Sequence, residues 1–169
     1  MKKLLIMIFL ATVLTACGND SQDKNNDNSS SENSTQNDNQ KVDEEESKYP
    51  FPEDSEQVGN ATVTITTASG SSEDGNVPVL IVQQDTLMEQ IGMDLANFQG
   101  DKQTFVYADK RFVQAEQVGE LTQTSLDVEG NLLDTGTHTV TAVQFEGDDP
   151  NGKVINYTEA KFEVKEGAS

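Results

Sequence analysis

The sequence contains one cysteine, one histidine, one arginine and no tryptophan in 169 residues. One cysteine excludes an internal disulfide, so any folded domain of this chain is stabilised by core packing. One histidine and one cysteine are also too few ligands for a His/Cys zinc site. The sequence has no glycine-rich phosphate-binding loop, and we therefore expect no cofactor.

Positive charge is scarce throughout the chain. Lysine and arginine together number 11, against 30 aspartates and glutamates, so the formal net charge is −19. A chain of this charge repels the phosphates of nucleic acids. A nucleic-acid partner is therefore not expected.

Apolar residues make up only 34% of the sequence, and they are unevenly distributed. Residues 18–48 are GNDSQDKNNDNSSSENSTQNDNQKVDEEESK, in which Val42 is the only aliphatic or aromatic residue. A segment of this composition cannot bury enough apolar surface to offset its chain entropy. We therefore expect residues 17–48, from the cysteine onward, to form a disordered tether.

The longest apolar run lies at the start of the chain, where LLIMIFLATVLTA follows two lysines. Its length is that of the apolar region of a signal peptide and is too short to span a bilayer. Residues 1–16 are therefore predicted to be an export signal. Whether the released peptide has a role of its own is left open by the sequence.

The stretch LTAC, residues 14–17, joins this run to the polar segment. It resembles the lipobox of bacterial lipoproteins, with Leu14, two small residues and then Cys17. The resemblance implies that the Cys17 thiol carries a diacylglyceryl group and that the mature chain begins there, anchored to the cell membrane on its extracytoplasmic side. The alternative is an ordinary secretory signal with an incidental cysteine.

Residues 49–169 are long enough for one domain with its own core, and they are rich in valine, isoleucine, threonine and aromatic residues. The prolines of YPFPEDSE, at 49–56, oppose both a helix and a central strand. ATVTITTA, at 61–68, alternates like a half-buried strand. VPVLIVQQ, at 77–84, indicates a strand that Pro78 places at a sheet edge.

Residues 86–98 fit two structures. Thr86 and Glu89 have the spacing of a helix capping box, and a helical stripe runs from Leu87 to Phe98. However, Ile91, Met93 and Leu95 alternate as in a strand, and Gly92 disfavours a helix by about 1 kcal/mol. We favour the strand.

The run DTGTHTVTA, at 134–142, resembles the sixth strand of immunoglobulin-like domains. Asp134, Gly136 and Ala142 match that motif, while His138 occupies the tyrosine-corner position and Val140 replaces the disulfide cysteine. The resemblance implies an all-β, immunoglobulin-like two-sheet sandwich at 49–169. Because both cysteines of the antibody-type pair are absent, the domain is not of the antibody type. Because His138 stands in place of the tyrosine, the corner bond would come from its imidazole.

The same resemblance implies which residues form the core. Val140 should lie opposite Ile91 or Met93, and Phe105 or Tyr107 should take the place of the missing core tryptophan. After Ala142 the apolar alternation shifts by one residue, which predicts a β-bulge there. With a tight turn at 108–111, a strand at 122–130 and a hairpin across 147–152, the domain should have seven or eight strands.

Candidate catalytic and metal-binding residues are few. His138 lies inside a patterned strand, so we interpret it as a structural corner residue rather than a base, and we expect no enzyme. A hydrolase would need carboxylates that only the fold brings together. Asp148, Asp149 and Asn151 are candidate calcium ligands in one turn, although their spacing is not that of an Asp-x-Asp-x-Asp-Gly loop.

These patterns together favour a cell-surface lipoprotein that displays its sandwich as a binding or accessory module for a protein or a cell-wall polymer. One alternative is a structural subunit of a membrane or envelope assembly. Others are a calcium-binding adhesion-type domain and a hydrolase. An exposed aromatic patch would favour the binding module, and an uncovered apolar edge at residues 79–82 would favour the assembly subunit.

Overall fold

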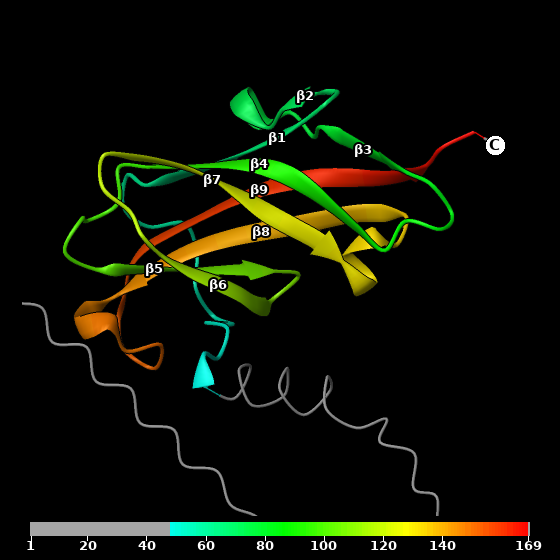
Figure 1. The fold of residues 1–169 in the computed structure, drawn as a ribbon. Coiled ribbons are helices and arrows are strands. Elements are labelled where there is room, and N and C mark those ends of the chain that lie inside the picture. The colour runs from blue at the N-terminus through cyan, green and yellow to red at the C-terminus, as the bar shows by residue number, and fades with distance from the viewer. Residues whose placement is uncertain (1–47, 169) are drawn as a thin grey trace, which may run out of the picture. The chain divides into compact units, whose positions relative to one another are not determined.

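The computed structural model describes residues 48–168, so the predicted signal peptide, Cys17 and nearly all of the predicted tether lie outside the described residues. Within residues 48–168 the chain forms nine strands joined by turns and three short 3-10 segments (Figure 1). No helix in that range is long and apolar enough to cross a membrane. The strands are β1 (Thr62–Thr67), β2 (Gly70–Ser71), β3 (Val79–Val82), β4 (Met88–Ala96), β5 (Gln103–Ala108), β6 (Arg111–Gln117), β7 (Leu121–Glu129), β8 (Gly136–Phe145) and β9 (Val154–Glu166).

The strands form two sheets packed face to face. One has four strands in the order β2-β1-β4-β7, and the other has five in the order β3-β9-β8-β5-β6. All pairs are antiparallel except β3 with β9, which run parallel. The predicted all-β, immunoglobulin-like two-sheet sandwich is confirmed, with β2 as a short additional strand.

The ambiguous segment at 86–98 is a strand, so the helix alternative is wrong. β4 pairs with β1 on one side and with β7 on the other. Ile91, Met93 and Leu95 point into the core, whereas Leu87, which a helix would have buried, is 86% exposed. Gly92 lies opposite Thr66 on the other face of the sheet, where a Cβ would make ordinary van der Waals contact with Thr66.

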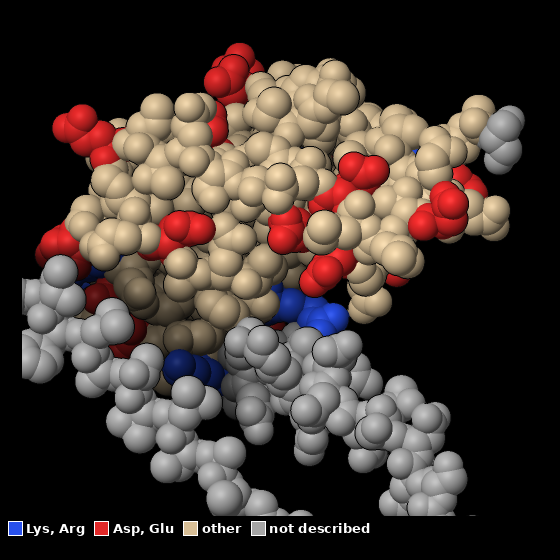
Figure 2. Space-filling model, in the orientation of Figure 1, with Lys and Arg blue, Asp and Glu red and all other residues tan. Residues whose placement is uncertain are grey.

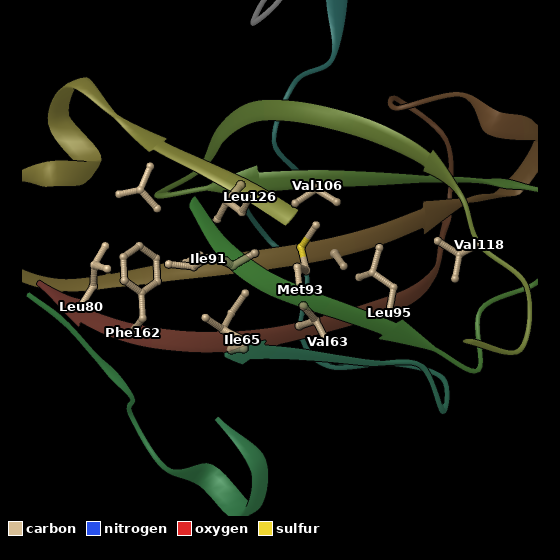
Figure 3. Packing of buried hydrophobic residues seen from close by; sticks show 14 of the residues in the cluster. Val63, Ile65, Leu80, Ile91, Met93, Leu95, Val106, Val118, Leu126 and Phe162 are labelled. Carbon is tan, nitrogen blue, oxygen red and sulfur yellow. The ribbon is translucent and has the colours of Figure 1, made fainter. Parts of the chain in front are cut away.

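The main core fills the space between the two sheets (Figure 3). Val140 from one sheet and Ile91 and Met93 from the other belong to it, as the sixth-strand resemblance implied. The prediction for Phe105 and Tyr107 is wrong in its location. Both are buried, but they lie in a second cluster. Between them, Val106 faces the main core, because neighbouring residues of a strand point to opposite faces.

The second cluster covers the outer face of the five-stranded sheet. It is closed by Tyr49 and Phe51, which belong to residues 49–58, here called the strap. β8 is therefore apolar on both faces, since Val143 and Phe145 pack under the strap. The cluster comprises Phe105, Tyr107, Val143, Phe145 and Tyr157, with Tyr49, Phe51, Phe112 and Val154 packed against it.

The bulge predicted near Ala142 is not found there. Ala142 pairs in register with Thr158 of β9 and with Val106 of β5. The register shifts later, where Gln144 pairs with Asn156 but Phe145 pairs with Val154. The apolar pattern of β8 changes because both of its faces are buried, and periodicity alone does not distinguish that case from a bulge.

The predicted turns and edge are present. Asp109 and Lys110 join β5 to β6 with φ values of 47° and 71°, both positive as in a type I′ hairpin turn. β8 and β9 pair across the loop that contains Gly147. β3 lies at the edge of the five-stranded sheet, beside β9 only.

Candidate functional site

His138 occupies a polar corner at the start of β8. Its Nε2 lies 2.8 Å from the carbonyl oxygen of Asp134, just before the strand begins. Its Nδ1 lies 2.6 Å from Oδ2 of Asp109, in the β5–β6 turn, and the ring stacks on Phe162 with centroids 5.2 Å apart. The side chain is buried. This is the geometry that the corner motif implies, with the imidazole bonded to the backbone near the preceding turn.

The corner leaves His138 poorly placed for catalysis. Each ring nitrogen already faces an acceptor, and the second oxygen of Asp109 accepts a hydrogen bond from the backbone N–H of Thr139. A general base needs a nitrogen that a substrate can reach. The Asp109–His138 pair therefore ties the β5–β6 turn to the start of β8.

We expect His138→Ala to lower the free energy of unfolding by about 2–4 kcal/mol, because it removes a buried ring and leaves Asp109 without its partner. His138→Tyr should cost less than half of that, since a tyrosine keeps a ring against Phe162 and a polar tip near Asp134. Urea unfolding of the three proteins measures the difference. Equal losses for both variants would contradict the corner role.

Of the three calcium candidates in the β8–β9 loop, the side chains of Asp149 and Asn151 contact each other, whereas that of Asp148 bonds elsewhere. Oδ1 of Asp148 accepts the backbone N–H of Gln103, while Oδ1 of Asp149 accepts the N–H of Asn151. Within residues 48–168 no group of three or more His, Cys, Asp or Glu side chains is placed to hold a metal ion. Asp148 instead links this loop to the start of β5.

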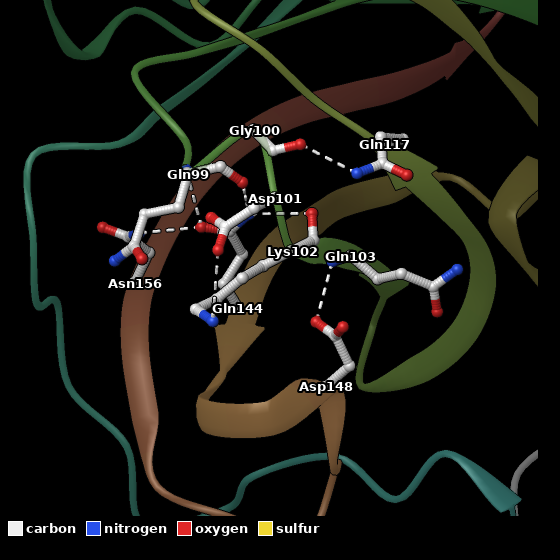
Figure 4. A network of polar contacts seen from close by, with 9 residues as sticks. All are labelled: Gln99, Gly100, Asp101, Lys102, Gln103, Gln117, Gln144, Asp148 and Asn156. Atoms are coloured by element: carbon white, nitrogen blue, oxygen red, sulfur yellow. Dashed lines mark hydrogen bonds and ion pairs between the residues drawn. The ribbon is translucent and has the colours of Figure 1, made fainter.

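A buried glutamine organises the same end of the sandwich (Figure 4). Gln144 of β8 is fully buried, and its Oε1 accepts bonds from the N–H of Gln99 and from Nδ2 of Asn156, both at 2.9 Å. Its Nε2 donates to the carbonyls of Gln99 at 2.9 Å and Lys102 at 3.3 Å. The β4–β5 loop is therefore held against β8 and β9 by one side chain.

The strap is held by aromatic and polar contacts. Tyr49 packs on Phe112 with ring centroids 4.4 Å apart, and Phe51 meets Tyr107 edge-on at 5.3 Å. The Tyr107 hydroxyl donates to the carbonyl of Pro50 at 3.2 Å. Sequence reasoning missed this cluster. Two features of the sequence could have indicated it: the two aromatic residues of YPFP, and the apolar residues that β8 carries on both of its faces.

Burial under the strap raises the pKa of two tyrosines from the ordinary value of 10.0. For Tyr157 desolvation is the main cause and the pKa is about 12. The nearby Glu159 carboxylate contributes, because it accepts a hydrogen bond from the Tyr157 hydroxyl at 2.6 Å. For Tyr107 desolvation alone raises the pKa further. Both hydroxyls therefore keep their protons well above pH 10.

The domain should lose stability in alkali for this reason. Both native pKa values exceed the unfolded one, so the stabilisation is complete below pH 10. It is lost as the pH rises, by about pH 12 for Tyr157 and at higher pH for Tyr107. Between pH 10 and about 12 each tyrosine should lower the free energy of unfolding by at most about 1.4 kcal/mol per pH unit, with the smaller effect from Tyr157. Urea unfolding across the range should show a shallower decline for Tyr107→Phe. Parallel declines would contradict the assignment.

A groove of about 470 Å³ opens at the end of the sandwich where β3 terminates. Its walls are the β3–β4 connection, which includes Leu87, the β7–β8 connection around Leu133 and Asp134, and Glu166 at the end of β9. Asp134 also bonds to His138, so the corner supports one wall of the groove. The groove offers amide, hydroxyl and carboxylate groups beside an exposed leucine.

The exposed surface is acidic and carries scattered apolar side chains. Figure 2 shows acidic side chains spread over the visible face, with most of the visible basic ones along its lower margin. Among residues 48–168 no aromatic side chain is among the large exposed apolar ones. Those are Val58, Val77, Ile81, Leu87, Met88 and Leu121.

No protein family matches the sequence, and no curated protein matches it. Similar solved structures include the fibronectin(III)-like modules of Clostridium thermocellum CbhA, with 8% identity, 64% of this chain and 100% of that chain covered, and a TM-score of 0.37. The solution structure of the CARDB domain of the Pyrococcus furiosus protein PF1109 is also similar, with 13% identity, 64% of this chain and 97% of that chain covered, and a TM-score of 0.38. The crystal structure of the same domain in complex with di-metal ions has 13% identity, covers 65% of this chain and 96% of that chain, and has a TM-score of 0.38. No functional statement follows from these similarities.

Proposed function

We propose that this protein is a lipoprotein of the bacterial cell envelope. A lipid on Cys17 holds it at the extracytoplasmic face of the cell membrane, and residues 18–48 form a tether to the sandwich. The sandwich acts as a binding or accessory module rather than as an enzyme. The sequence LTAC after a short apolar run supports the anchor.

The observation that carries the proposal is the packing of the strap. The polar sequence ends at Lys48, and the next residue, Tyr49, already packs on Phe105 and Phe112. Further along, Val58 exchanges backbone hydrogen bonds with Tyr157 of β9. The predicted tether therefore passes directly into a segment that packs on the domain. A module displayed on a tether needs such a boundary between a flexible linker and a packed core.

The edge of β3 gives little support to the assembly-subunit alternative. The N–H and C=O of Val79, which point away from β9, bond to the hydroxyls of Ser69 and Thr67. The N–H of Gln83 bonds to Thr86. Because peptide directions alternate along a strand, the remaining open peptide groups of β3 belong to Ile81. One residue is too short an edge for strand addition.

Replacing Cys17 with alanine tests the anchor. The Cys17→Ala variant should accumulate as an unprocessed precursor or be released to the medium, because neither the lipid nor the cleavage site can form without the thiol. Fractionation of cells and mass spectrometry of the mature N-terminus measure this. Ser21→Ala, in the predicted tether, is the matched control and should stay anchored. A Cys17→Ala protein that is processed and retained at the membrane as the natural protein is would refute the anchor.

The binding role needs a separate experiment on intact cells. Crosslinking should capture the same partner with the natural protein and with Ser21→Ala. Capture should be lost when Tyr49 and Phe51 are both replaced by serine, because that change unfolds or loosens the module while leaving Cys17 in place. Equal capture by the disrupted protein would assign the contact to the tether instead.

A further inference from the structure

β7 is a long edge strand without a partner on its outer side in the described part of the chain. Its nine residues, Leu121–Glu129, pair with β4 in one unbroken register from Ala96 back to Met88. It is the last strand of the four-stranded sheet. β6 and β7 are joined directly through residues 118–120, and no further strand covers this edge within residues 48–168.

The hydrogen bonds of the sheet show which peptide groups of β7 point outward. Ile65 of β1 bonds with both its N–H and its C=O to Ser72, on the side away from β4. Alternation then directs the peptide groups of Met93 toward β7 and those of its partner Thr124 toward β4. Ser125 therefore faces outward, and its carbonyl accepts a bond from Nε2 of Gln114 at 3.4 Å. The residues of β7 whose backbone N–H and C=O groups point away from β4 are Leu121, Gln123, Ser125, Asp127 and Glu129.

The other sheet edges are shorter, bonded or irregular. β2 has two residues, and the open side of β3 is closed except at Ile81. β6 is interrupted by a register shift opposite Val106 and Tyr107. Short strands and irregularities are devices that prevent strand addition, and β7 has neither of them.

The charge beside the β7 edge is negative. Asp127 and Glu129 are exposed on β7. Half-buried Glu116 of β6 lies close to the same edge, because Nε2 of Gln114 donates both to Glu116 and to the Ser125 carbonyl. None of the three forms an ion pair with another residue of the range 48–168. Residues 49–169 hold 6 basic and 21 acidic residues, a net charge of 6 − 21 = −15, so a second copy of the domain would be repelled.

We propose that β7 is a docking edge, at which an extended segment of a partner protein with lysine or arginine at alternate positions adds a fifth strand to the four-stranded sheet. The outward peptide groups of β7 would bind the backbone of that segment, and Asp127, Glu129 and Glu116 would select its basic side chains. The proposal rests on the binding role proposed above and names the class of partner.

The test uses the full chain in detergent and a ten-residue probe peptide that alternates lysine with valine. The unmodified protein should bind it saturably below about 1 mM, and the amide signals of Gln123 and Ser125 should shift most in NMR spectra. A peptide with glutamate in place of lysine should not bind. Saturable binding of both peptides, or of neither, would overturn the proposal.

Two matched pairs of variants separate the edge from the rest of the surface. Ser125→Pro removes an N–H that points away from β4, so it leaves the hydrogen bonds to β4 intact and should weaken binding by about tenfold or more. Its control is Ala115→Pro, at a position of β6 whose peptide groups also point outward, which should change binding by less than about twofold. Glu129→Lys should weaken binding by about fivefold, and Glu73→Lys, in the β2–β3 connection, should not.

Equal effects within either pair would overturn the proposal. Concentration-dependent self-association that Ser125→Pro abolishes, without peptide binding, would also overturn it, because the occupant would then be a second copy. Loss of folding in Ser125→Pro alone would imitate the expected loss of binding. The Glu129→Lys pair separates the two cases, because that substitution leaves the backbone of β7 unchanged. The result of the peptide test does not depend on lipidation or on the cell, so its failure is distinguishable from failure of the proposed anchor or of partner capture.

Discussion

Replacing Gln144 with leucine should lower the free energy of unfolding by about 3–4 kcal/mol, although leucine is apolar and close to glutamine in size. The side chain is fully buried and makes four hydrogen bonds. Leucine would leave the N–H and C=O of Gln99, the C=O of Lys102 and the amide of Asn156 without their partner. Each buried polar group left unpaired costs about 1–3 kcal/mol, reduced here where water reaches the loop. Urea unfolding measures the change.

An exposed glutamine provides the control for this change. Gln123 of β7 donates to the carboxylate of Asp94 at 3.2 Å on the surface, and Gln123→Leu should change stability by less than about 1 kcal/mol. In the double variant Gln144→Leu with Asn156→Leu, part of the loss should be recovered, since one buried amide no longer lacks a partner. A loss for Gln144→Leu no larger than that for Gln123→Leu would show that the network does not hold the loop.

Strand positions could be predicted from the sequence because apolar and polar residues alternate along a strand that has one buried face and one exposed face. Val63 and Ile65 in β1, and Ile91, Met93 and Leu95 in β4, alternate in the sequence and are buried in the structure. In β4 this pattern outweighed a helical stripe, since pairing with two neighbouring strands stabilises residues that a capping box alone does not. His138 could be placed because its neighbours form a local motif.

The face on which each residue lies could not be predicted in the same way. Alternation states that Phe105 and Tyr107 share a face, but it does not state that something covers the outer face of their sheet. The cover comes from Tyr49 and Phe51, more than fifty residues away in sequence, in a segment whose prolines exclude regular structure. A bulge near Ala142 was inferred for the same reason, because a strand buried on both faces loses its alternation.

The acidic residues show a similar limit. Asp148 and Asp149 are adjacent in sequence, yet their side chains bond to backbone groups in different places. Asp109 and His138 are 29 residues apart, yet they form the corner. Sequence identifies which residue types are available, whereas the register of β5 against β8 decides which of them meet.

The strap makes the boundary between tether and domain a matter of packing rather than of composition. Tyr49 and Phe51 are the only aromatic residues of the strap. Their rings enter the second cluster and contact rings from β5, β6 and β9. Without them, Phe105, Tyr107 and Tyr157 would expose their outer faces. These two side chains therefore make the outer face of the five-stranded sheet a second core.

Replacing both Tyr49 and Phe51 with serine should lower the free energy of unfolding by about 3–5 kcal/mol, because two half-buried rings are lost and the rings beneath them meet water. Edge-on aromatic contacts add about 0.5–1.5 kcal/mol each to the burial of apolar area. Urea unfolding gives the loss, and binding of a hydrophobic dye to the folded variant reports the exposed cluster. Val42→Ser, the only aliphatic position of the predicted tether, should leave both quantities unchanged. If the double variant matched Val42→Ser, the strap would belong to the tether, and the folded unit would begin near β1.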